Sequence, residues 1–258
     1  GATVDIRGYG TDPEPLDRFL RDNPGGTLVL DRSFNSDPLL EAIRPYVDKM
    51  MIVVGVGYFI THTTEWISDL ILYQNCHRVT VKELHNIVPG ASVWAGPDYL
   101  LLNPLSPVIR ARAGKKHGIF IYFGAGWPRG YGGAVANELS RLLPEASVIQ
   151  NWHKDPLPLL AKSRLFVGSM GMIVHEAVAV GTSVVCASID HEHAVDATAH
   201  ELKYKVQHVG QLKDVGPEIV AAAAAKAYKA PALLSPINAW DCMGIYRVAR
   251  WLLDEERK

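Results

Sequence analysis

Short apolar runs rich in β-branched residues alternate with stretches of helical periodicity along most of the chain, and this rhythm predicts parallel βαβ units. Strands are expected at 27–31, 50–56, 69–73, 91–95, 118–123, 147–150, 165–168, 183–187 and 206–209. Helices are expected at 39–47, 134–143, 156–161, 171–180, 195–202, 217–228 and 241–253. The segment 103–118 is rich in Pro, Gly and basic residues and predicts a linker. The sequence therefore predicts an α/β protein with two Rossmann-like parallel-sheet lobes.

Composition narrows the class of protein further. The chain has 258 residues, 48% of them hydrophobic and 21% charged, so a folded core is expected rather than disorder. Its 26 basic and 27 acidic residues give a net charge of −1, which carries no strong signal for nucleic acid. Three scattered cysteines, no transmembrane segment and no signal peptide make a cytoplasmic location the expectation.

The first candidate site is a glycine-rich turn after the strand at 118–123. It contains Gly124, Ala125, Gly126 and Arg129, and a helix is expected to follow it. Such a turn brings backbone N–H groups close to an anion at a helix N-terminus, which suits a phosphate or diphosphate. Its spacing, G-x-G-x-x-x-G, departs from the dinucleotide fingerprint. The alternative is that these glycines only close a tight turn.

The second candidate is the turn Gly168-Ser-Met-Gly171, which joins a buried strand to a helix. Its N–H groups again lie at the carboxyl end of a strand, where ligands bind in open α/β sheets. Glu176 follows about one and a half turns into the helix, and its carboxylate can accept two hydrogen bonds from a diol such as ribose. A solvated helix glutamate is the alternative.

The second turn, Glu176 and the run to Cys186 together resemble the nucleotide-sugar-binding motif of GT-B glycosyltransferases. The likeness is greatest to the branch with the pseudaminic acid pathway UDP-sugar hydrolase, spore-coat polysaccharide proteins and the lipid II-forming N-acetylglucosaminyltransferase. The segments 95–102 and 241–247 are similar to that group's Gly-Pro-x-Tyr-x-x-Leu and closing-helix motifs. The resemblance implies that backbone groups of Ser169, Met170 and Gly171 bind the diphosphate and that Glu176 binds the ribose.

A GT-B-like fold implies two lobes with a cleft between them. Residues 1–106 would form a shortened, acceptor-side lobe and residues 107–258 the nucleotide-sugar lobe, with the helix at 241–253 a candidate to pack back on the first lobe. The implied function is transfer of a sugar from a nucleotide diphosphate sugar, such as a UDP-sugar, to an unknown acceptor in polysaccharide biosynthesis or to water. No cofactor or metal is expected.

The N-terminal segment lacks the Gly-rich loop that carries the catalytic histidine in the hydrolase. Because of this difference, the alternative function is that of a nucleotide-sugar-binding or scaffold protein without catalytic activity. The family's Asn-Gln pair is also replaced here, by Asp190 and His191.

Several polar residues are further candidates. Asp190 and His191 could act as a general acid/base pair, could belong to a metal site with His193, or could lie in a solvated loop. Asp31 and His77 follow strands of the first lobe and are the other catalytic candidates. Trp152 could stack on the base of the nucleotide or could be a partly buried interface residue.

Overall fold

The structure is a computed structural model, and it describes residues 14–32, 41–54, 68–74, 91–124, 130–150, 155–204, 206–230 and 240–253. These residues fall into two compact units. The first holds residues up to 72 together with 91–94, and the second holds 73–74 and the described residues from 95 onward. The predicted domain boundary after residue 106 and the predicted cleft between the lobes stay predictions.

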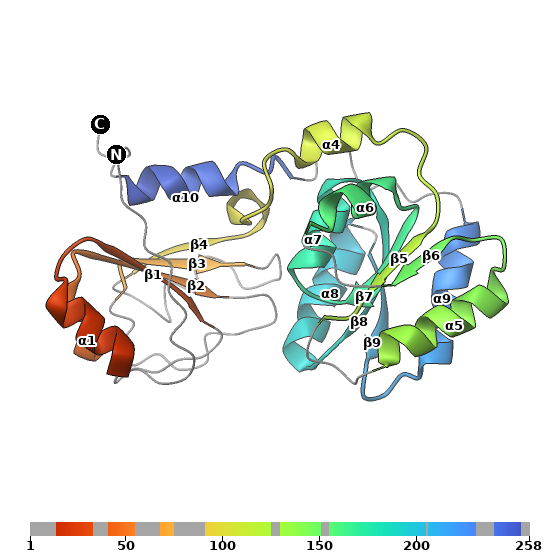
Figure 1. Cartoon of the computed structure of the whole chain (residues 1–258), viewed down its shortest axis with the longest axis horizontal. Coiled ribbons are helices and arrows are strands. Elements are labelled where there is room, and N and C mark those ends of the chain that lie inside the picture. Colours follow the sequence, from red (N-terminus) through yellow and green to blue (C-terminus); the bar gives the residue numbers. More distant parts are fainter. Residues whose placement is uncertain are drawn as a thin grey trace. The chain divides into compact units, whose positions relative to one another are not determined.

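The first sheet contains four strands in the order β1-β2-β3-β4 (Figure 1). They are β1 (Thr27–Arg32), β2 (Lys49–Val54), β3 (Leu70–Tyr73) and β4 (Ser92–Ala95). Strands β1 and β2 pair in parallel from Thr27↔Lys49 to Arg32↔Val54. Helix α1 (Glu14–Asp22) precedes the sheet, and the 3-10 helix η1 (Arg44–Tyr46) leads into β2. All four strands agree with the sequence prediction.

The second sheet has the order β6-β5-β7-β8-β9, and its neighbouring strands all pair in parallel. Its strands are β5 (Ile119–Tyr122), β6 (Val148–Gln150), β7 (Leu165–Ser169), β8 (Ser183–Ser188) and β9 (Gln207–Gln211). From β5 the chain goes outward to β6 and then returns to the other side of β5 as β7. This reversal is a topological switch point, where ligands bind beyond the carboxyl ends of the strands.

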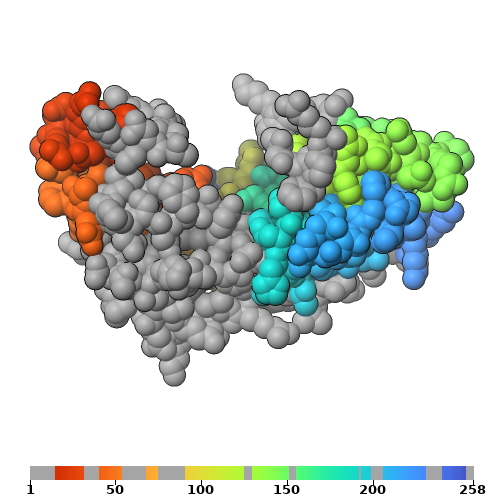
Figure 2. Space-filling view, turned by 90° about the horizontal axis from the view of Figure 1, so that it is seen from below, coloured from red at the N-terminus to blue at the C-terminus, as the bar shows by residue number. Residues whose placement is uncertain are grey.

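Helices cover both faces of the second sheet (Figure 1). On one face Phe120 and Phe166 pack with α6 (Leu157–Lys162), α7 (Met172–Ala179) and Ala197 of α8 (His191–Tyr204). On the other face Ile119 and Ile121 pack with α5 (Tyr131–Leu142) and α9 (Pro217–Lys229). Figure 2 shows α5 and α9, green and blue, side by side on the surface. Because successive side chains of a strand point to opposite faces, β5 contributes Phe120 to one hydrophobic core and Ile119 and Ile121 to the other.

Two local predictions were wrong. The segment predicted as a linker contains helix α4 (Ser106–Arg112), which has Pro107 in its first turn and packs Ile109 against the core. The polar loop predicted between the strand at 183–187 and the helix at 195–202 contains the start of α8, because the carboxylate of Asp190 accepts a hydrogen bond from the backbone N–H of His193. Such a side-chain acceptor stabilises the first turn of a helix.

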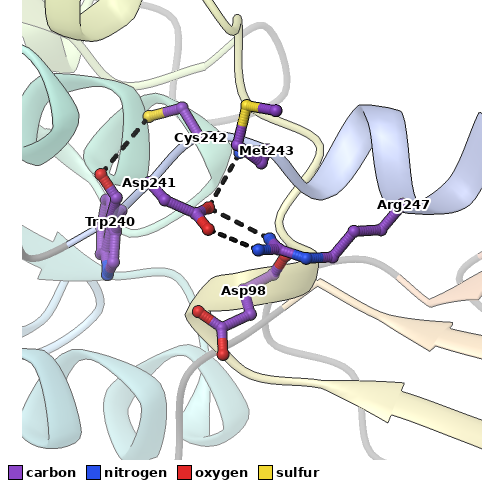
Figure 3. A network of polar contacts seen from close by, with 6 residues as sticks. All are labelled: Asp98, Trp240, Asp241, Cys242, Met243 and Arg247. Atoms are coloured by element: carbon purple, nitrogen blue, oxygen red, sulfur yellow. Dashed lines mark hydrogen bonds and ion pairs between the residues drawn. The ribbon is translucent and has the colours of Figure 1, made fainter.

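The segments 95–102 and 241–247, which resembled two motifs of one family, contact each other in the structure (Figure 3). Arg247 of α10 (Gly244–Leu252) donates to the carbonyl oxygen of Asp98, in the 3-10 helix η2 (Pro97–Tyr99), at 2.6 Å. The same guanidinium pairs with the carboxylate of Asp241. A Cβ added to Gly244 would meet the carbonyl oxygen of Leu100, so glycine permits this close approach.

Candidate functional site

Gly124, where the first glycine-rich segment begins, lies next to the turn Gly168–Gly171 at the switch point of the second sheet. Gly124 follows β5, and a Cβ placed on it would lie 3.8 Å from Oγ of Ser169, the last residue of β7. Gly168 pairs with Tyr122, and a Cβ at Gly168 would collide with the Tyr122 carbonyl oxygen. Glycine at 168 thus keeps β5 and β7 close, and two turns 45 residues apart in sequence form one edge.

Helix α7 begins at this edge without a side-chain cap. Its N-cap residue is Gly171, and a Cβ added there would meet no atom of the described residues within 4 Å. The first N–H groups of a helix have no acceptor within it, and they carry the positive end of the helix dipole. Met170, which was predicted to offer its backbone to a diphosphate, instead donates its N–H to the carbonyl oxygen of Ala187 at 3.0 Å.

Glu176 is the acidic residue closest to this edge on α7. Its side chain is half-buried, and burial, together with the negative charge of Asp155, raises the pKa of the Glu176 carboxyl above its ordinary value. Asp155 precedes α6, and its carboxylate accepts a hydrogen bond from the backbone N–H of Leu157 at 3.2 Å. A half-buried carboxylate beside another acid is costly to keep, which is typical of a functional position.

Asp190 and His193 form a pair at the start of α8, beyond the carboxyl end of β8. The carboxylate Oδ1 of Asp190 lies 2.7 Å from Nδ1 of His193 and 2.9 Å from its backbone N. The predicted partner, His191, is exposed. From the sequence, His193 was considered only as a metal ligand. The D-x-x-H spacing at the start of a helix was nevertheless a signal that Asp190 caps α8.

A buried histidine and aspartate, His175 of α7 and Asp196 of α8, were missed by sequence analysis. Both side chains are fully buried, with Nε2 of His175 4.0 Å from Oδ2 of Asp196. The ring of Trp240 lies edge-on to His175, with the ring centroids 5.5 Å apart. The pair connects α7 and α8, which begin at the carboxyl edge of the second sheet, called here the ligand edge. Neither residue had a sequence pattern that indicated its partner.

The remaining candidates lie in the first unit or outside the described residues. Asp31 is the penultimate residue of β1 in the first unit and is exposed. His77, Ala125, Gly126, Arg129 and Trp152 lie outside the described residues, and their roles stay predictions.

Two features, a metal site and a membrane-spanning helix, are absent from the described part of the chain. Within it, no three His, Cys, Asp or Glu residues gather as a metal site would require. No helix in that part is both long enough and apolar enough to cross a membrane.

Comparison with solved structures places the fold. UDP-GlcNAc 2-epimerase from Neisseria meningitidis, solved with UDP-GlcNAc, superposes with a TM-score of 0.58 at 14% identity, over 94% of this chain and 80% of that one. MurG from Acinetobacter baumannii superposes with a TM-score of 0.57 at 12% identity, over 96% and 82%. The chain has a GT-B-type fold.

A plant protein shares the GT-B-type fold as well. UGT89C1 from Arabidopsis thaliana superposes with a TM-score of 0.53 at 12% identity, over 93% of this chain and 71% of that one. Neither a protein-family model nor a curated protein sequence matches the chain. At these identities the likeness establishes the fold, and the activity has to be argued from the site.

Proposed function

We propose that the protein binds a nucleotide diphosphate sugar at the carboxyl edge of β5 and β7 and transfers the sugar to an acceptor or to water. The observation that carries this proposal is the position of Gly124, at the end of β5, beside Ser169, which precedes the N-terminus of α7, a helix without a side-chain cap. Solved structures with the same fold support it, since one of them holds UDP-GlcNAc.

The diphosphate is assigned to the start of α7. Backbone N–H groups there are unpaired within the helix, and a helix N-terminus favours negative charge. The first turn of α7 carries no acidic side chain that would compete with an anion. As the bond between sugar and diphosphate breaks, these groups stabilise the charge that develops on the leaving diphosphate. We expect this helix terminus, with Arg129, to serve in place of a divalent ion.

Glu176 is assigned to the ribose. It lies on α7 less than two turns from Gly171, and its carboxylate accepts hydrogen bonds while ionised. A ribose diol supplies two hydroxyl donors, which would repay part of the cost of keeping this carboxylate half-buried beside Asp155. Trp152 is the proposed stacking surface for the base.

The reaction is a displacement at the anomeric carbon of the sugar. An oxygen of the acceptor or of water forms the new bond to that carbon, the bond to the diphosphate oxygen breaks, and its electron pair leaves with the diphosphate. A base takes the proton of the attacking hydroxyl. The candidates for this base are Asp31, His77 and the Asp190 carboxylate that contacts His193. The rival proposal is a protein that binds the nucleotide sugar and does not turn it over.

A thermal-shift panel of UDP, GDP, CDP, TDP and CMP tests the binding step. A ligand that binds only the folded state raises the melting temperature by mass action. We expect one nucleoside diphosphate to stabilise the protein selectively, and a flat panel on folded protein would refute the proposal.

Glu176→Gln is the matching variant and Glu145→Gln its control, since Glu145 is exposed and precedes β6. Loss of the charged acceptor should weaken binding by about 1 to 3 kcal/mol in the first variant, and the control should bind like the parent. Sugar release from the matching nucleotide sugar then separates the enzyme from the rival binding protein.

A further inference from the structure

Lys116 lies at the end of the second sheet opposite the ligand edge, because it precedes β5 whereas Gly124 follows it. Its ammonium group donates three hydrogen bonds, to the carbonyl oxygens of Ala161 (2.8 Å) and Val180 (3.0 Å) and to Oγ1 of Thr182 (3.0 Å). An ammonium group has three donors and no acceptor, so these contacts use all of its protons.

Two of the three acceptors belong to the C-terminal ends of α6 and α7, and the third, Thr182, lies between α7 and β8. Ala161 lies in the last turn of α6, and Val180 is the C-cap residue of α7. Oγ1 of Thr182 also donates to the carbonyl oxygen of Leu160 at 2.5 Å, which ties β8 to α6 as well. Positive charge at a helix C-terminus is favourable, and here one cation serves two of them.

The site ends of the same helices carry groups that repel each other. Asp155 stands immediately before α6 and Glu176 lies on α7, and the charge of Asp155 acts on the Glu176 carboxyl. Glu176 is also one helical turn from Val180, an acceptor of Lys116. Its carbonyl oxygen accepts a hydrogen bond from the backbone N–H of Val180 at 3.1 Å. The repulsion between the two carboxylates has to be offset by favourable contacts between the same two helices, such as those of Lys116.

We propose that Lys116 is a positioning residue that clamps the C-terminal ends of α6 and α7 and thereby holds Asp155 and Glu176 together at the ligand edge. The effect on nucleotide binding rests on the proposed function, whereas the effect on the two carboxylates does not. The ammonium is held in place by the acceptors named above, and the guanidinium of Arg110, from α4, is the neighbouring charge that acts on it.

The test is an NMR titration of the Glu176 carboxyl in the ligand-free protein. In Lys116→Met the helices should relax apart, and the pKa of Glu176 should fall toward its ordinary value because Asp155 recedes and water enters. Removal of the lysine charge by itself would raise this pKa, so a fall reports the geometry. Asp155→Asn is the positive control, since it removes the repelling charge directly.

Thr182→Val gives the same test without a change of charge, and Thr182→Ser, which keeps the hydroxyl, is its control. Thr182→Val should lower the Glu176 pKa and weaken nucleoside diphosphate binding about 2- to 30-fold, whereas Thr182→Ser should match the parent. An unchanged Glu176 pKa in folded Lys116→Met and Thr182→Val would overturn the clamp. If the parent binds no nucleotide while the pKa still falls, the clamp stands and the proposed function fails.

Discussion

Asp190 accepts two hydrogen bonds from His193, one from the backbone N–H at 2.9 Å and one from Nδ1 at 2.7 Å. The carboxylate therefore caps α8 and orients the imidazole at the ligand edge. Asp190→Ala should lower the free energy of unfolding by about 0.5 to 2 kcal/mol, the usual cost of losing an N-cap.

The control for this prediction is His191→Ala, since His191 is exposed and next in sequence. Its effect should stay within about 0.5 kcal/mol, as for most surface substitutions. Denaturant unfolding of the two variants measures both values. Equal stability of Asp190→Ala and the parent would show that the cap contributes nothing.

Glu176→Gln should stabilise the ligand-free protein as the pH rises. The folded-state pKa of Glu176 is raised, so the folded chain binds more protons than the unfolded chain above the ordinary pKa, and its stability falls as the carboxyl ionises. Glutamine has no such cost. The difference in melting temperature between variant and parent should grow with pH through this window, and a difference independent of pH would contradict the assigned burial.

Gly244→Ala should destabilise the protein more than Arg247→Met does. The added Cβ would meet the carbonyl oxygen of Leu100 and lie 2.8 Å from the carbonyl carbon of Tyr99, where the backbone cannot easily give way. We expect a cost of about 1 to 3 kcal/mol, as for overpacked sites.

The Arg247 pair with Asp241 is partly exposed, at 36% and 41% of their side chains, and such pairs contribute up to about 1 kcal/mol. Urea unfolding ranks the two variants. The reverse order would mean that the ion pair, and not the close approach of α10 to η2, holds this junction (Figure 3).

Lys116 should make the free energy of unfolding rise with pH in the alkaline range. Burial, with the charge of Arg110, lowers the pKa of the ammonium from 10.5 to about 8. Between these values the unfolded chain binds more protons than the folded chain, so stability increases with pH. Comparison of the parent with Lys116→Met from pH 8 to 10 isolates this effect from other groups, and parallel stability curves would contradict it.

The sequence was sufficient for the sheets because apolar strand patterns are local. All nine strands that the described residues form were predicted, as was the position of each glycine turn after a strand, whereas the placement of Gly124 beside Ser169 was not predicted. Helix α1 was missed although Leu16, Phe19 and Leu20 have helical spacing. Helix α4 is short and has Pro107 in its first turn, which makes it resemble a loop in sequence.

The polar contacts were harder to predict, because they depend on packing between distant segments. His175 and Asp196 meet only because α7 and α8 cover the same face of the sheet. Lys116 was interpreted as part of a basic linker, and its three acceptors come from the last turn of α6, from the C-cap of α7 and from Thr182, which precedes β8. No spacing rule connects these residues, so their roles required the structure.

Amide chemical shifts of the ¹⁵N-labelled protein, titrated with each nucleoside diphosphate, test the central claim most directly. We expect one of them to shift the amide signals of Gly124, Ser169, Gly171 and Glu176 saturably and to leave that of Glu145 unchanged. No saturable shift with any nucleoside diphosphate, or shifts confined to residues away from the ends of β5 and β7, would contradict it.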